Sequence, residues 1–176
     1  MATTKTADAL HGTATKELPP NFTYPFKRVA SVERIDDGLA CIATMTGQSL
    51  DTIKNMAYEL GLPKFGPAWV YQDTLTAIAA KFGLVVSEWK EASSIAALPD
   101  VAVLSVDVTK YEYGRLVVFT HFRGTETYPS FSAICDPGDW LSPQHHLTTE
   151  WKHLRMSKPI WYLEVTSKPQ ASGKTK

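Results

Sequence analysis

Apolar residues recur at helical spacing in three stretches between positions 38 and 83. Leucine, isoleucine, alanine and methionine follow Gly38 over 39–45 and stop at Gly47, which predicts a short buried helix. Ser49 can cap a second helix over 50–60, which Gly61 would end. A third pattern begins near Gln72 or Asp73 and ends at Gly83.

The remaining apolar positions occur in short β-rich runs bounded by proline, glycine and aspartate. These runs predict strands over 84–89, 101–106, 116–122, 131–135 and 160–165. Because the helices precede the strands, we expect an α+β domain in which an N-terminal helical layer packs on a mostly antiparallel sheet. The run 115–121 is apolar on both alternating faces, which predicts a central strand covered on each side.

The two ends of the chain lack this apolar periodicity. We interpret residues 1–21 as a flexible N-terminal arm and residues 166–176 as a flexible C-terminal tail. The region 22–165 between them is long enough for one domain, and the 44% hydrophobic content of the chain suffices for a sizeable core.

Charge and cysteine usage exclude several classes of function. Eighteen basic residues balance eighteen acidic residues, so no net field favours nucleic acid or an anionic membrane. The apolar runs are too short to cross a bilayer and no segment resembles a signal peptide, so we expect a cytoplasmic protein. Two cysteines, Cys41 and Cys135, are then expected to be free thiols.

Motifs for cofactors and metals are not found in the sequence. It contains no glycine-rich phosphate loop, no Cys-x-x-Cys and no His-Glu-x-x-His. His145, His146 and His153 invite a metal site, but we interpret them as a surface loop because adjacent histidines diverge. We therefore expect no cofactor and no metal.

The most informative stretch is 31–44, where a polar segment turns through Gly38 directly into an apolar helix. Such a junction leaves backbone N–H groups without helical partners and presents the positive end of the helix dipole. Cysteine peptidases use this position to stabilise a thiolate, with a histidine from a later strand as base.

Residues 36–43, Asp-Asp-Gly-Leu-Ala-Cys-Ile-Ala, resemble the signature of papain-like peptidases that cut double-glycine leaders from bacteriocins, Asp-Cys-Gly-x-Ala-Cys-Leu-Ala. The order of later motifs is also similar, with 98–104 as the proline-containing strand, 114–119 as the strand of the catalytic histidine, and 134–138 as the Asp-Pro motif. The resemblance covers about residues 30–140 and implies a papain-like fold.

The same resemblance implies a degenerate catalytic triad. The nucleophilic cysteine of the family corresponds to Asp37, its oxyanion glutamine to Ser31 and its histidine to Arg115, while the orienting aspartate is retained as Asp136. A carboxylate is a poor nucleophile toward an amide, and an arginine cannot act as a general base at ordinary pH.

Two replacements at facing positions suggest that they compensate one another. We expect Asp37, Arg115 and Asp136 to form an ion-pair network, with Asp37 within about 4 Å of Arg115. In the alternative, Asp37 only caps the helix and Arg115 extends to solvent.

A rival interpretation retains an enzyme, with Cys41 as nucleophile, His121 as base and Asp136 as orienting residue. Cys41 lies one helical turn deeper than Asp37, which favours a core position. Six residues of strand separate His121 from Arg115, about 20 Å, so contact between Cys41 and His121 would require a bulge or another register.

Several aromatic residues lie in or beside predicted loops, where they could line a recognition groove or shield the sheet edges. These residues are Trp69, Tyr71, Trp89, Tyr111, Tyr113 and Trp140. The favoured interpretation is a pseudoenzyme that binds a peptide or protein segment in the former cleft. Two alternatives stay open: a thiol peptidase or amidase centred on Cys41, and a structural component of a larger particle.

Overall fold

The protein is described by a computed structural model that covers residues 18–20, 22–65, 69–110 and 114–168. Three helices come first: α1 (Asp37–Thr46), α2 (Leu50–Glu59) and α3 (Gln72–Lys81). The three predicted helices are therefore confirmed. Ser49 accepts a hydrogen bond from the Thr52 N–H at the start of α2, and Gly47 ends α1 with a φ of 68°, a conformation that favours glycine.

Six strands follow in the described part of the chain: β1 (Leu84–Ala92), β2 (Val101–Val106), β3 (Arg115–Phe122), β4 (Phe131–Cys135), β5 (Leu147–Thr148) and β6 (Ile160–Ser167). They form one sheet in the order β1-β6-β2-β3-β4-β5, and every neighbouring pair is antiparallel. The α+β class and the antiparallel sheet are thus confirmed.

Three details of the sheet differ from the sequence prediction. Strand β1 continues to Ala92, three residues beyond the predicted end at 89. The two-residue strand β5 was not predicted, because it is too short to produce an alternating pattern. Residues 166 and 167, which the sequence assigned to the tail, belong to β6, where they pair with Val85 and Leu84 of β1. The strand therefore extends two residues beyond the expected end of the domain.

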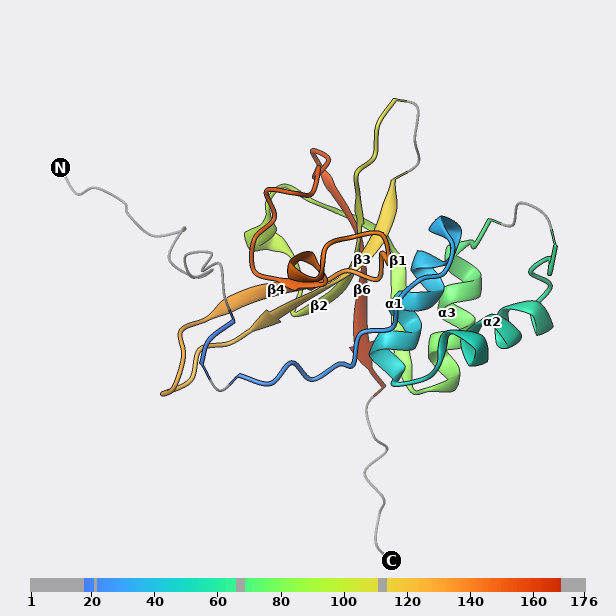
Figure 1. Ribbon diagram of the computed structural model, residues 1–176, viewed down its shortest axis with the longest axis horizontal. Coiled ribbons are helices and arrows are strands. Elements are labelled where there is room, and N and C mark those ends of the chain that lie inside the picture. Colours follow the sequence, from blue (N-terminus) through green and yellow to red (C-terminus); the bar gives the residue numbers. More distant parts are fainter. Residues whose placement is uncertain (1–17, 21, 66–68, 111–113, 169–176) are drawn as a thin grey trace, which may run out of the picture.

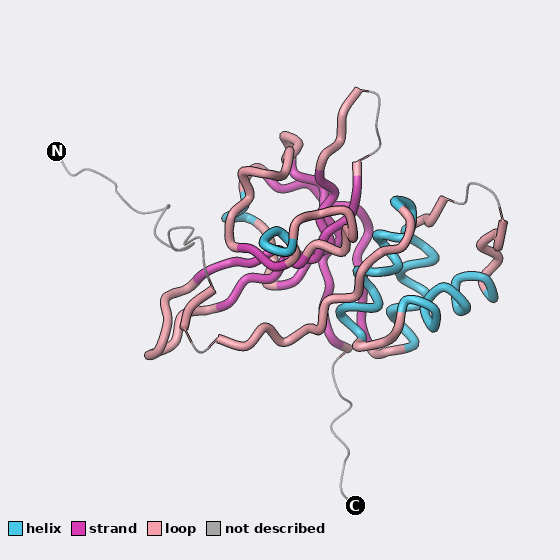
Figure 2. Tube along the Cα trace, viewed as in Figure 1, coloured by secondary structure: helices cyan, strands magenta, loops and turns pink. Residues whose placement is uncertain are grey.

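The helices gather on one face of the sheet (Figures 1 and 2), where α1 packs on β3 and α3 packs on β1. Buried side chains from all three helices form a core with one face of the sheet, and Val118 of β3 belongs to it. A second core lies on the other face, where Phe119 stacks on Trp151 with ring centroids 5.7 Å apart. The central strand is covered on both faces, as its sequence predicts.

The segment that precedes α1 is fixed to the far end of β3. Phe22 packs edge-on against Phe122 and Phe131, with ring centroids 4.7 and 4.9 Å apart. Tyr24 forms a 2.8 Å hydrogen bond with the Thr120 hydroxyl. These contacts lead the chain along the sheet to the loop before α1, where the candidate site lies. Among the described residues, no helix has the length and apolarity that a membrane-spanning segment requires.

Candidate functional site

A cavity of about 430 Å³ lies at the N-terminus of α1. Asp37 and Gly38 of α1, Arg115 and Leu116 of β3, and a group of aromatic and aliphatic residues around the start of α3 line it. The second group includes Trp69, Val70, Tyr71, Leu75 and Trp89. The positions that the resemblance assigned to the nucleophile and the base therefore border one pocket with largely apolar walls.

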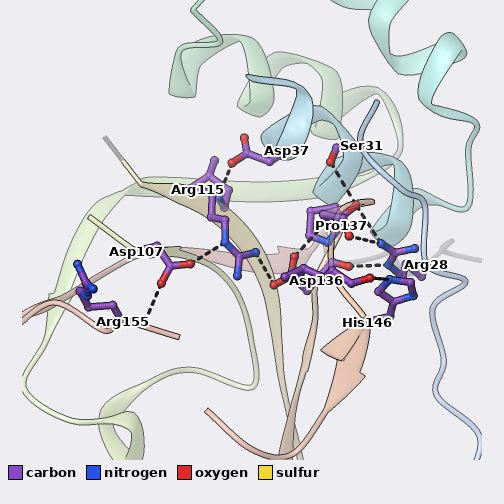
Figure 3. A network of polar contacts seen from close by, with 12 residues as sticks. Arg28, Ser31, Asp37, Asp107, Arg115, Asp136, Pro137, His146 and Arg155 are labelled. Atoms are coloured by element: carbon purple, nitrogen blue, oxygen red, sulfur yellow. Dashed lines mark hydrogen bonds and ion pairs between the residues drawn. The ribbon is translucent and has the colours of Figure 1, made fainter. Parts of the chain in front are cut away.

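Asp37 is the first residue of α1, and its carboxylate points toward β3 (Figure 3). One carboxylate oxygen accepts a 2.6 Å hydrogen bond from the Leu116 N–H, and the other accepts one of 2.6 Å from the Gly38 N–H. Burial nevertheless raises the pKa of Asp37 from 3.8 to about 6, because these hydrogen bonds and the charge of Arg115 offset only part of the desolvation.

The raised pKa of Asp37 predicts a specific pH dependence of stability. Because the pKa is higher in the folded chain than in the unfolded chain, the folded state binds more protons between these two values. The free energy of unfolding should therefore fall as the pH rises from about 4 to about 7, and Asp37→Asn should lack this contribution. Urea unfolding of both proteins at several pH values should show the free energy of unfolding of the wild type falling relative to that of Asp37→Asn over that interval. A constant difference would contradict the assignment.

Arg115 begins β3, and only 7% of its surface is exposed. Its Nε donates a 2.7 Å hydrogen bond to Asp107, and its Nη1 forms an ion pair with Asp136, which is fully buried (Figure 3). Burial works against the charged guanidinium, but the hydrogen bonds and charges of the two carboxylates outweigh it and raise the pKa of Arg115. The guanidinium is therefore a permanently charged group fixed between two aspartates.

Of the two contacts expected of Arg115, the structure has one and lacks the other. Arg115 pairs with Asp136 as predicted, but no ion pair joins Arg115 to Asp37 in the described part of the chain. Asp37 instead binds the Leu116 amide, and Asp107 takes the second carboxylate position at the guanidinium. The alternative in which Arg115 extends to solvent is also wrong, because its side chain is buried.

Asp107 is a site residue that the sequence analysis missed. It has a φ of 58°, and its second carboxylate oxygen accepts a 2.7 Å hydrogen bond from the Arg155 N–H. Gly114, with a φ of 77°, lies against Val106, where a Cβ atom would come within 2.4 Å of the Val106 carbonyl oxygen. Val106 pairs with Arg115 at the ends of β2 and β3, so Asp107, the next residue, lies within reach of the guanidinium.

The loop that carries Asp136 is held by Arg28. The Arg28 guanidinium donates hydrogen bonds to the carbonyl oxygens of Asp136, Pro137 and Gly138, at 2.6, 3.1 and 2.8 Å. Ser31, which corresponds to the family's oxyanion glutamine, is buried and donates from its hydroxyl to the Pro137 carbonyl oxygen. Ser31 lines neither of the two pockets described for this region.

A second cavity, of about 590 Å³, lies on the other side of Arg115. It is lined by Val32, Arg34, Asp107, Thr109, Arg115, Trp140 and Arg155. Arg34 and Arg115 line both cavities, so the two lie next to each other across these side chains. Among the residues that the structure describes, no cysteine or histidine contributes to either lining.

The aromatic residues predicted to form a groove are divided between the two cavities. Trp69 and Tyr71 line the first, and Tyr71 is 68% exposed. Trp140 lines the second. Tyr111 and Tyr113 lie outside the described residues. Trp89, a residue of β1, also lines the first cavity.

The thiol and the imidazole of the rival site lie away from the two cavities. Cys41 is fully buried in the helical core, and burial raises the pKa of its thiol well above the ordinary value. Burial likewise raises the pKa of Cys135 to about 12. His121 is near the opposite end of β3 from Arg115, where its ring hydrogen-bonds the Ser132 and Ser130 hydroxyls at 2.9 and 3.2 Å.

The histidines considered as metal ligands take other roles. His145 and His153 stack with ring centroids 4.4 Å apart, and the His146 Nε2 contacts the Leu141 carbonyl oxygen at 3.0 Å. In the part of the chain that the structure describes, no cluster of three or more histidine, cysteine or acidic residues is arranged to hold a metal ion.

Comparisons with known proteins bear on the fold. No protein-family model and no curated protein matches the sequence. A solved structure of a double glycine motif protease from an AMS/PCAT transporter, in complex with the leader peptide, is similar with a TM-score of 0.51 and 12% identity. The match covers 85% of this chain and 96% of that chain. At this identity the likeness extends to the fold alone.

Proposed function

We propose that this chain is a catalytically degenerate relative of the double-glycine peptidases that binds a peptide or protein segment in the two adjoining cavities. One observation carries the proposal. The positions that the resemblance assigns to the nucleophile and the base, Asp37 and Arg115, border one cavity, and both side chains are engaged by neighbouring groups.

Neither group is suited to peptide cleavage. The Asp37 carboxylate has both oxygens in hydrogen bonds to backbone amides, which lowers its reactivity further. The Arg115 guanidinium keeps its proton at any ordinary pH and is fixed by two carboxylates. The arrangement therefore favours a protein that uses the groove to bind a ligand and does not cleave it.

The walls of the first cavity are suited to holding a side chain of a partner. Exposed aromatic residues contribute large contact areas with little loss of conformational freedom, and Tyr71 and Trp69 stand at the rim of a concave site. The leader peptide bound by the similar protease supports a peptide as the ligand class here.

The test is peptide binding measured by fluorescence anisotropy with a library of labelled, acetylated and amidated dodecapeptides that contain one leucine anchor. We expect members of the library to bind the wild-type protein, and Tyr71→Ala to weaken them at least about fivefold. Trp161→Ala is the matched control, because Trp161 is an exposed aromatic residue that lines neither cavity. Equal effects of the two substitutions, or no binding at all, would contradict the proposal.

A further inference from the structure

The second cavity is rich in hydrogen-bond donors and poor in acceptors. Arg34, Arg115 and Arg155 line it together with the indole of Trp140, whereas Asp107 is the one carboxylate among the described residues of the lining. Guanidinium and indole groups donate hydrogen bonds and accept none. A ligand group that accepts hydrogen bonds and carries negative charge fits such a lining.

Both oxygens of the Asp107 carboxylate already accept a hydrogen bond. One oxygen receives the Arg115 Nε–H and the other receives the Arg155 backbone N–H, at 2.7 Å each. The bond to Arg155 therefore ends on its main chain and not on its guanidinium (Figure 3). Among the described residues, the Arg155 side chain has no ion-pair partner, and it is exposed at the cavity wall.

Arg115 does not offer the same charge to a ligand. Its guanidinium is balanced by Asp107 and Asp136 and is buried, so it acts as a fixed divider between the two cavities. Arg155 contributes an accessible charge, beyond the divider and away from the apolar walls around Tyr71.

The dimensions indicate where a carboxylate of the ligand would come from. A carboxylate group occupies about the volume of one or two water molecules, roughly 30 Å³ each in the liquid. The second cavity measures about 590 Å³, so it can admit several residues of a continuing chain. This volume favours an acidic side chain within a continuing peptide over a free peptide C-terminus that ends beside Arg115.

We propose, on the basis of the function proposed above, that the bound segment carries an acidic residue on one side of an apolar anchor residue. An apolar side chain fills the cavity beside Tyr71, the chain crosses Arg115, and an aspartate or glutamate side chain binds the Arg155 guanidinium in the second cavity.

The experiment uses pairs of the labelled dodecapeptides described above. Each pair has the same leucine anchor and carries either glutamate or glutamine at a varied distance on either side of it. At about 20 mM salt we expect at least one glutamate peptide to bind about threefold or more tightly than its glutamine partner. The preference should decline at about 0.5 M salt, because the pair is exposed to solvent.

Two variants test whether Arg155 is responsible. Arg155→Gln should abolish the glutamate preference, so that each glutamate peptide binds no more tightly than its glutamine partner. Arg123→Gln should preserve the preference, because Arg123 is 84% exposed, pairs with Asp100 and lines neither cavity. A third peptide series with glutamine and a free C-terminus separates the two carboxylate sources.

The outcomes distinguish this inference from the proposed function. Binding of glutamine peptides that Tyr71→Ala weakens, without any glutamate preference, would retain the groove and overturn the acidic partner. A preference that survives Arg155→Gln, or one shown only by free C-termini, would also overturn it. If peptides of no series bind, both the groove and the acidic partner are wrong.

Discussion

Arg115→Met is expected to lower the free energy of unfolding by about 3–5 kcal/mol, because it leaves the fully buried Asp136 carboxylate without its countercharge. Methionine preserves much of the side-chain volume, so the loss reports the charge and its hydrogen bonds more than a cavity. Urea denaturation monitored by tryptophan fluorescence measures it.

Two further variants show whether the loss of stability comes from a buried ion pair. Arg123→Met removes an exposed arginine that also pairs with an aspartate, and it should cost less than about 1 kcal/mol. Arg115→Met combined with Asp136→Asn should lose less stability than the sum of the single losses, because no lone buried charge remains opposite the methionine. Strict additivity of the two substitutions, or a loss at Arg115 no larger than that at Arg123, would contradict a buried ion pair.

The second large effect is expected on thiol reactivity, when a cysteine and a histidine replace Asp37 and Arg115. Combining Asp37→Cys with Arg115→His would set a thiol at the N-terminus of α1 beside an imidazole that Asp136 can orient. The helix terminus and the imidazolium lower a thiol pKa, in related arrangements to between about 3.5 and 7.5. The introduced thiol should react with iodoacetamide with a pH midpoint below about 7, whereas both native cysteines should react slowly.

The matched control is Asp37→Cys alone, in which Arg115 stays bound to Asp107 and Asp136. Its introduced thiol should show a higher pH midpoint than that of the double variant. Thermal melting of both variants before labelling verifies that they are folded. Identical pH profiles would mean that positions 37 and 115 do not face each other as nucleophile and base, which would remove the basis of the register.

The sequence was sufficient for the elements because local signals determine them. Gly47 and Ser49 mark the boundary between α1 and α2, and the dense apolar pattern of β3 specifies a strand covered on both faces. A strand as short as β5 has no such signal, since its pairing depends on the loop that brings it beside β4.

The polar site was predictable only in part. The pairing of Arg115 with Asp136 follows from the order of motifs, but the choice between Asp37 and Asp107 as second partner depends on tertiary geometry. The Leu116 amide occupies the Asp37 carboxylate, and a left-handed backbone turns Asp107 toward the guanidinium. Neither the amide hydrogen bond nor that turn has a sequence signature, although an aspartate directly after a strand is a typical turn residue.

The positions of Arg28 and Arg155 were equally inaccessible to sequence patterns. Each is an isolated arginine in an irregular segment, and each reaches the site through contacts with residues far along the chain. Their roles depend on which loops come together at the start of β3, where Arg115 lies.

Mass spectrometry of the dodecapeptide library after prolonged incubation with the wild-type protein shows whether the groove binds peptide without cleaving it. We expect the peptides to bind and remain intact, with neither Cys41 nor Cys135 rapidly alkylated at neutral pH. Cleavage products that disappear in Cys41→Ala would contradict it, because they would show that the buried thiol is the nucleophile of a working peptidase.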